Sequence, residues 1–458
     1  MALKQNVAVA AFKAAAGELI EASLCEVQGA WLALVQTAEG KRLAYAAQGE
    51  TALGKLWKEI EKSADVDGVH VDVMKLNANN AAALRRFVKW TAPSACGTKG
   101  ASVGFSDWLG EAAAVVAPLF AKRQLKPVLV DFTPEDSAAL GRNFLEAVDT
   151  ATWGVLEEGY KDGYGANAAG LKTEEDIVKA LLYGYSMIGF DCSDKINLEI
   201  EKLSDEAVDK RFEQFNDAFR AAVHASYLNA EFKVGSSKLT FTENELHRIV
   251  LEYGEAIMHI QFIYNSYLKN TPWDIDFELS LSKPGKVLTP QEHYLIANEL
   301  QRNGIKLSAI CLDPLKDSEA LEKNLQLHCE IADTFGYRLS FVNADIAMVN
   351  TATAMKFLKG KVHFKMNNIL WMSAVKLVKA LDTDLFGKLC AAAGCEQPEG
   401  AVCGRMEAGR ALALGYKKVL NPKENGNVAA DMKPFLEAHH DEYAAEVQKN
   451  VGAHLKDI

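Results

Sequence analysis

The residues of this chain that could do chemistry are polar side chains placed just after short apolar runs. They are Asp131, Asp194, Asn343, Asp345, Lys365, Asn367 and Arg405. A carboxylate and an ammonium in one site can pass protons, and amides and a guanidinium can hold the oxygens of a polar ligand. We predict catalytic roles for Lys365 and Asp345 and substrate-binding roles for the other five.

Each of these residues also has an ordinary structural explanation. Lys365 and Arg405 could each hold the carboxylate of a ligand or form an ion pair with a neighbouring aspartate. No histidine follows a predicted strand, so a divalent cation would depend on aspartates alone. The aspartates at strand ends are Asp131, Asp194, Asp313 and Asp345. The preferred alternative is that they cap the following helices, and from the residues themselves we predict no metal site.

The elements that must position these side chains are short strands alternating with longer helices. From about residue 95 onward, runs rich in β-branched residues alternate with helical stretches, which is typical of parallel sheets. We predict strands at Ser102–Phe105, Pro127–Phe132, Ser186–Asp191, Ile275–Leu281, Leu307–Leu312, Leu339–Asn343, Val362–Met366 and Gly400–Gly404. Eight such strands indicate an α/β fold, a closed (β/α)8 TIM-type barrel, in which function collects at the carboxyl ends of the strands.

Two further regions are predicted around this barrel. Residues 1–90 read as a small α/β region, and residues 91–458 form the barrel itself. Residues 195–273 form a helical, charged insertion after the third predicted strand, which would border the active-site end of the barrel. The glycine-rich run Gly163–Gly170 lacks a preceding strand, so we interpret it as a tight loop and not as a phosphate-binding loop.

Composition argues against several classes of partner. The 458 residues carry a formal net charge of -11, which repels phosphate backbones and disfavours nucleic acid and anionic membranes. No apolar run approaches the ~18 residues of a membrane span, and the first residues lack a signal-peptide pattern. The eight cysteines include no CxxC pair, so we expect reduced thiols and a cytoplasmic location. His259, His328 and His363 lie within apolar patterns and are predicted to be structural.

Several segments of the chain resemble the tagaturonate/fructuronate epimerase family. The most specific is Asp149–Tyr160, with the sequence DTATWGVLEEGY, followed by Gly163–Ala166. Weaker but collinear matches are Phe190–Asp194, Phe277–Ser280, Glu299–Gly304, His328–Ala332, Lys361–Lys365 and Asp384–Phe386. The resemblance implies a metal-dependent isomerase of hexuronate breakdown that interconverts D-tagaturonate and D-fructuronate at C-4. A divalent cation, Mn, Ni or Zn, would then polarise the substrate oxygens.

The chain departs from the pattern of that family where the chemistry is expected. Ser282-Lys283 stands in place of an Asp-Glu pair, and Ala169-Gly170 stands in place of an Asp-His pair. Further replacements fall at Asp313, Val342–Ala347 and Met366–Asn368, while Lys365 is retained. Replacing Asp-Glu by Ser-Lys inverts the local charge and so opposes a bound cation.

We interpret the chain as a degenerate member of this family, catalytically inactive or altered. Such a member would bind a sugar acid or act as a partner or structural subunit, and would need no cofactor. The alternative is an active metal-dependent sugar-acid epimerase or isomerase with a rearranged site. In either case the chain could form a homo-oligomer or bind another protein.

Overall fold

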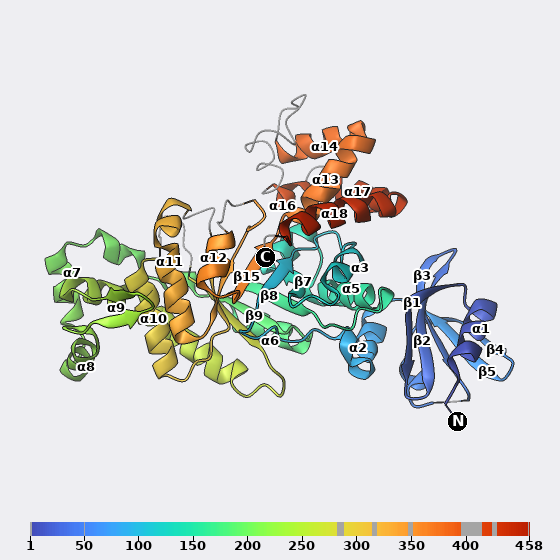
Figure 1. The fold of residues 1–458 in the computed structure, drawn as a ribbon, viewed down its shortest axis with the longest axis horizontal. Helices are drawn as coiled ribbons and strands as arrows, with labels where there is room; N and C mark the ends of the chain where they lie inside the picture. Colours follow the sequence, from blue (N-terminus) through green and yellow to red (C-terminus); the bar gives the residue numbers. More distant parts are fainter. Residues whose placement is uncertain are drawn as a thin grey trace.

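The fold is described by a computed structural model, shown in Figure 1. It describes residues 2–49, 51–281, 288–313, 318–346, 351–394, 415–423, 428–456 and 458. Within these ranges no helix combines the length and the apolar character that crossing a bilayer requires.

The centre of the molecule is a closed barrel of eight parallel strands. They are β6 (Ser102–Phe105), β7 (Lys126–Phe132), β8 (Gly165–Leu171), β9 (Met187–Asp191), β12 (Asp276–Ser280), β13 (Ala309–Leu312), β14 (Arg338–Phe341) and β15 (Val362–Met366). Barrel strands that follow one another along the chain pair with each other, and β15 pairs with β6 to close the ring. The predicted TIM-type barrel is therefore confirmed.

The sequence-based prediction missed one strand of the barrel. The strand that completes the barrel is β8, which pairs with β7 and β9, whereas Gly163–Gly170 was predicted to be a tight loop. That prediction was wrong. The segment Gly400–Gly404, predicted as the eighth strand, lies outside the described residues, and the eight strands above already close the ring.

Helices follow the strands, and the described helices after β15 gather together beyond one end of the barrel (Figure 1). The elements are α3 (Ala113–Val116), η3 (Ala117–Phe120), α4 (Pro134–Leu140), α5 (Phe144–Glu157), α6 (Glu174–Leu182), α10 (Pro290–Arg302), α11 (Ser318–Phe335), α12 (Thr351–Phe357), α13 (Ile369–Leu381), α14 (Thr383–Ala393), α16 (Tyr416–Val419), α17 (Val428–Ala438) and α18 (His440–His454). Helix α10 shows how the sequence fixes a start: Thr289 and Glu292 form a capping box around Pro290.

The first part of the chain forms a five-stranded antiparallel sheet. Its strands are β1 (Glu18–Val27), β2 (Ala30–Thr37), β3 (Gly40–Ala47), β4 (Ile60–Val66) and β5 (Val69–Met74), in the order β1-β2-β3-β5-β4. Helix α1 (Gln5–Ala15) packs on one face of the sheet, and α2 (Ala78–Phe87) and α5 contribute to the core on the other. On α5, Val155 is in the barrel core while Leu156 is in the core beneath the sheet, so this helix joins the two regions.

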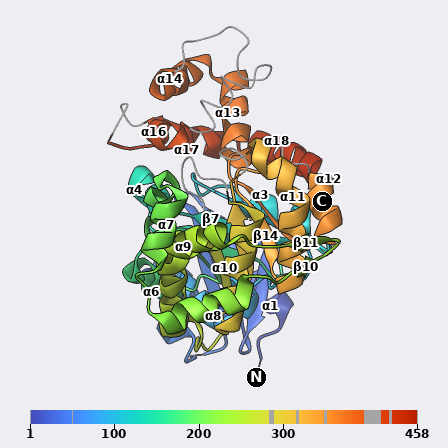
Figure 2. The ribbon, with the colours of Figure 1, turned by 90° about the vertical axis from the view of Figure 1, so that its left-hand side faces the viewer.

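Between β9 and β12 the chain builds a lobe on the side of the barrel away from the N-terminal sheet (Figures 1 and 2). It comprises η4 (Ser193–Lys195), η5 (Leu198–Lys202), α7 (Asp205–Phe212), α8 (Asp217–Tyr227), β10 (Phe232–Val234), β11 (Ser237–Leu239), α9 (Glu243–Ile263) and η6 (Tyr264–Leu268). Helix α9 packs against both α7 and α10. The lobe is thereby attached to the barrel through its longest helix.

Candidate functional site

The interior of the barrel contains a buried group of charged side chains. Lys365 is on β15, Glu278 on β12 and Asp131 on β7, and each has only 2% of its side chain exposed. The Lys365 ammonium donates a hydrogen bond to Glu278 Oε1 and lies 3.9 Å from Asp131 Oδ1. TIM barrels usually fill this volume with branched apolar residues, so a charged group here is an exception that the chain must stabilise locally. We call Asp131, Glu278, Lys365 and Asn167 the polar centre.

Amide side chains complete the hydrogen bonding of Asp131. Asn167 on β8 donates to its Oδ1 at 2.8 Å, and Asn367, just beyond β15, donates to its Oδ2 at 2.9 Å. The Asn367 amide also donates to Ser106 Oγ at 2.9 Å. Each oxygen of the buried carboxylate therefore has a donor, which is what burial of a charge requires.

The charged groups of the polar centre influence the pKa values of Asp131 and Lys365. Burial raises the pKa of Asp131, and the nearby Lys365 ammonium opposes that rise. Burial works against the charge on Lys365, but Asp131 and Glu278 outweigh it and raise its pKa above the usual value. Lys365 is therefore a charged ammonium held between two carboxylates, and not a neutral amine ready to accept a proton.

A second polar group forms on the loops after β14 and β15. Asn343, with φ of 54°, donates its backbone amide to Asn367 Oδ1 at 3.0 Å and accepts from Asn368 Nδ2 at 3.1 Å. Asp345 Oδ2 accepts from the Asn368 backbone amide at 2.8 Å, and its Oδ1 is buried with no hydrogen-bond partner. Burial raises the pKa of Asp345 to about 6, which is near the range useful for acid–base work.

The structure brings together five of the seven residues singled out from the sequence. Asp131, Lys365, Asn367, Asn343 and Asp345 form one connected network through Asn368. Asp194 lies apart, with 69% of its side chain exposed and Lys172 Nζ 3.0 Å away. Arg405 lies outside the described residues, as do Ser282 and Lys283. The catalytic and binding roles assigned to these residues stay predictions.

Sequence reasoning missed two members of the polar centre. Glu278 belongs to the alternating polar series Asp276, Glu278 and Ser280 on β12, and that alternation was the available signal for an inward-facing row. Asn167 was missed because its strand was interpreted as a loop. The ion pair of Lys365, one of the two alternatives left open, is present, and its partners include Glu278 as well as an aspartate.

The described residues at the polar centre do not fit a divalent cation. Their two carboxylates, Asp131 and Glu278, already face the Lys365 ammonium, whose charge would repel a metal ion placed between them. Among the residues the structure describes, the one cluster with metal-ligand spacing is His224, Glu243 and His247, in the lobe and not in the barrel.

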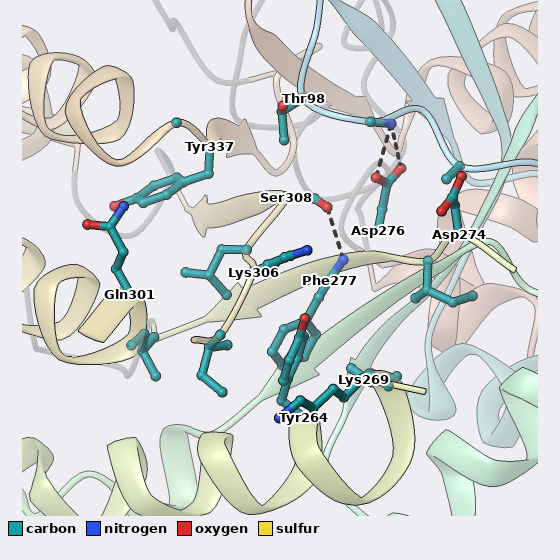
Figure 3. A pocket seen from close by; sticks show the side chains of 18 of the residues that line it. Thr98, Tyr264, Lys269, Asp274, Asp276, Phe277, Gln301, Lys306, Ser308 and Tyr337 are labelled. Carbon is teal, nitrogen blue, oxygen red and sulfur yellow. Dashed lines mark hydrogen bonds between the residues drawn. The ribbon is translucent and has the colours of Figure 1, made fainter. Parts of the chain in front are cut away.

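A large cavity opens at the opposite, amino-terminal ends of the barrel strands. It has a volume of about 840 Å³, and its lining includes Asp276, Lys306, Ser308 and Tyr337. The Asp276 carboxylate, labelled in Figure 3, accepts from the backbone amide of Cys96 at 2.6 Å and from that of Gly97 at 3.0 and 3.2 Å. Function in this fold collects at the carboxyl ends of strands, so the polar centre and the loops above it remain the candidate site.

Comparison with known proteins places the whole barrel in one family. The sequence model of UxaE, described as tagaturonate epimerase, matches residues 20–401. The tagaturonate/fructuronate epimerase of Thermotoga maritima is 28% identical over 383 residues, which cover 81% of this chain and 78% of the relative. The native crystal structure of fructuronate-tagaturonate epimerase UxaE from Cohnella laeviribosi is 25% identical, with a TM-score of 0.87 and 98% of each chain covered. Its complex with one glycerol gives a TM-score of 0.86, covering 99% of this chain and 98% of the other.

Proposed function

Since the chain belongs to the tagaturonate epimerase family, we propose that it is a degenerate member whose barrel binds a sugar acid without metal-dependent epimerisation. The relatives are named for the interconversion of tagaturonate and fructuronate. Inverting a carbinol carbon requires a proton, a hydride or a carbon–carbon bond to be removed and returned, together with polarisation of the substrate oxygens. We propose that this chain no longer inverts a carbinol carbon in this way.

Two observations together carry the proposal: both central carboxylates are paired with the Lys365 ammonium, and Ala169-Gly170 on β8 stands in place of the Asp-His pair of the family. The ammonium lies between Asp131 and Glu278, the two carboxylates of the barrel centre, and all three are nearly inaccessible to solvent. An ammonium with a raised pKa supplies a fixed charge and hydrogen bonds, but it neither polarises a substrate as a metal does nor accepts a proton near neutrality. The centre is thus suited to holding the barrel together.

Binding would use the loops above the polar centre. Asn343 and Asn367 present amides on two neighbouring strand ends, and the buried Asn368 holds Asn343 in place. Amides can pair with both hydroxyl and carboxylate oxygens of a sugar acid. A role as a partner or structural subunit, a homo-oligomer and a cytoplasmic location remain predictions from the sequence. The six cysteines the structure describes are all free thiols, in keeping with that location.

The test is proton NMR of the purified chain with D-tagaturonate, with manganese, nickel and zinc supplied in separate tubes. We expect no D-fructuronate in any tube and saturation transfer from protein to the sugar-acid protons. Turnover with any metal would overturn the loss of epimerisation. Absence of both turnover and saturation transfer would overturn sugar-acid binding and leave a structural or partner role.

A second candidate function rests on Asp345. Burial raises the pKa of its carboxyl to about 6, so a proton can leave and return near neutral pH. That property favours an altered isomerase that uses Asp345 as its base. If turnover does appear, Asp345→Asn should abolish it, whereas Asp333→Asn, which changes an acid on α11 paired with two lysines outside the site, should not.

A further inference from the structure

The lobe brings four metal-compatible side chains together from three helices. Asp209 is on α7, His224 on α8, and Glu243 and His247 on α9. Glu243 and His247 are four residues apart, so they lie on the same face of α9 one turn from each other. Helices α7, α8 and α9 lie close together in the lobe (Figure 2).

The ligand atoms of this cluster already converge. The Nε2 atoms of His224 and His247 are 2.8 Å apart, and Glu243 Oε1 lies 4.0 Å from His224 Nε2. All three ligand atoms lie within 4.8 Å of one another. Two imidazole nitrogens this close must share a proton or share a cation, since two lone pairs facing each other repel.

The ring of His247 is oriented by a carboxylate behind it. Its Nδ1 lies 2.7 Å from Asp209 Oδ1, which also accepts from Asn244 Nδ2 at 3.1 Å. An acceptor at this position places the proton of the neutral ring on Nδ1 and leaves the lone pair on Nε2, facing His224. A carboxylate bonded to the far nitrogen of a histidine is the arrangement that recurs behind metal-bound histidines.

Aromatic packing holds the two rings while one side stays open. Phe212 stacks on His247 with ring centroids 3.8 Å apart and on His224 at 5.5 Å, with interplanar angles of 14°. The side chain of His247 is 6% exposed, that of His224 32% and that of Glu243 64%. The cluster therefore has a fixed inner ligand, a half-buried second ligand and a solvent-facing acid.

We propose that His224, Glu243 and His247 bind a divalent transition-metal ion of the zinc type, with Asp209 as the positioning residue. Two histidines, one carboxylate and an open position for water make a tetrahedral set that suits zinc. Zn–N bonds of about 2.0–2.1 Å would require the two nitrogens to separate to roughly 3.3 Å. The exposed Glu243 can move toward the ion by a change of rotamer. The ion would tie α8 to α9.

The experiment is a zinc titration of the full chain after chelator treatment, followed with a chromophoric zinc indicator, and repeated with cobalt(II) to record its absorption. The variants are His224→Ala and Glu243→Gln, both at partly exposed positions. His440→Ala serves as the matched control because its side chain is also partly exposed, at 45%, and lies on α18. Circular dichroism checks that each variant is folded.

We expect wild type and His440→Ala to bind one equivalent of zinc more than His224→Ala, and Glu243→Gln to bind that equivalent at least tenfold more weakly. Cobalt should give the intense absorption of a tetrahedral ion in wild type, and that band should vanish in His224→Ala. Subtracting the zinc stoichiometry of His224→Ala from that of wild type removes the contribution of any zinc bound elsewhere on the chain. Equal stoichiometry and affinity in wild type and His224→Ala, or no zinc bound by wild type, would overturn the proposal and leave a histidine–histidine hydrogen bond.

Discussion

The polar centre of the barrel and the histidine cluster of the lobe differ in what faces their acids. In the barrel, Asp131 and Glu278 face an ammonium from the same chain, and all three are buried. In the lobe, the acids flank two imidazoles, and Glu243 reaches solvent. Carboxylates alone do not make a metal site. Where a lysine of the chain faces the carboxylates, they form a structural ion pair with it. Where neutral imidazole nitrogens face them, the site can accept a metal cation from solution.

The largest effect should come from removing the internal cation. Lys365→Met leaves Asp131 and Glu278 buried and uncompensated, and breaking a buried pair from one side costs about 3–5 kcal/mol. Urea unfolding at pH 7 would measure the change in the free energy of unfolding.

The matched control is Lys361→Met, next to the same strand. Lys361 pairs with Asp333 at 2.7 Å, but the two side chains are 35% and 26% exposed, so its loss should cost about 1 kcal/mol or less. Equal effects of the two substitutions would contradict the view that Lys365 is a buried structural cation.

Removing one facing acid should restore part of this loss. In the double variant Glu278→Gln/Lys365→Met, one of the two buried charges left unpaired is gone, and we expect about 2 kcal/mol to return relative to Lys365→Met alone. The measurement is a double-mutant cycle by urea unfolding. Simple additivity of the two single substitutions would show that the hydrogen bond from Lys365 to Glu278 carries no coupling.

Most of the barrel could be predicted because its strands are locally apolar and β-branched. β7 and β15 are examples, and both were found. β8 escaped because its sequence, GANAAGL, contains no β-branched residue. The structure explains the small residues: a Cβ on Gly165 would lie 2.9 Å from Val128 Cγ2 and 3.0 Å from Cys96 Sγ. Close packing around β8 requires small residues, so β8 lacks the β-branched side chains on which strand prediction depends.

The candidate sites were less predictable because their partners are distant in sequence. Lys365 and Glu278 are 87 residues apart, and only the closure of the barrel brings them together. His224 and His247 are 23 residues apart on separate helices, with no short metal-ligand spacing between them. The sequence indicates that polar residues gather at the strand ends. Strand register and helix packing then decide which of these residues pair.

A pH dependence should distinguish the loops above the polar centre from the centre itself. Burial raises the pKa of Asp345 to about 6, above its unfolded value of about 3.9, so the folded state binds the proton more tightly. Stability from this group is present below about pH 4, is lost as pH rises to about 6, and is flat above. Asp345→Asn should therefore gain about 2–3 kcal/mol over wild type between pH 4 and pH 7.

Urea unfolding at several pH values would measure that gain, and the Asp345 carboxyl resonance would report its pKa directly. A Glu437→Gln variant provides the control, because Glu437 is an exposed acid on α17. If wild type and Asp345→Asn keep a constant difference in stability across the range, the raised pKa of Asp345 is wrong.

The smallest effect should come from the positioning acid of the lobe. Asp209→Asn keeps a hydrogen-bond acceptor near His247 Nδ1 but removes the charge that raises the basicity of the ring. We expect zinc affinity to fall roughly tenfold, the lower end of the effect of such acids, without loss of stoichiometry. An Asp209→Asn variant that binds zinc as tightly as wild type would show that the carboxylate only packs against the ring. The histidine cluster would then lack the oriented nitrogen that sets it apart from the charge-balanced centre of the barrel.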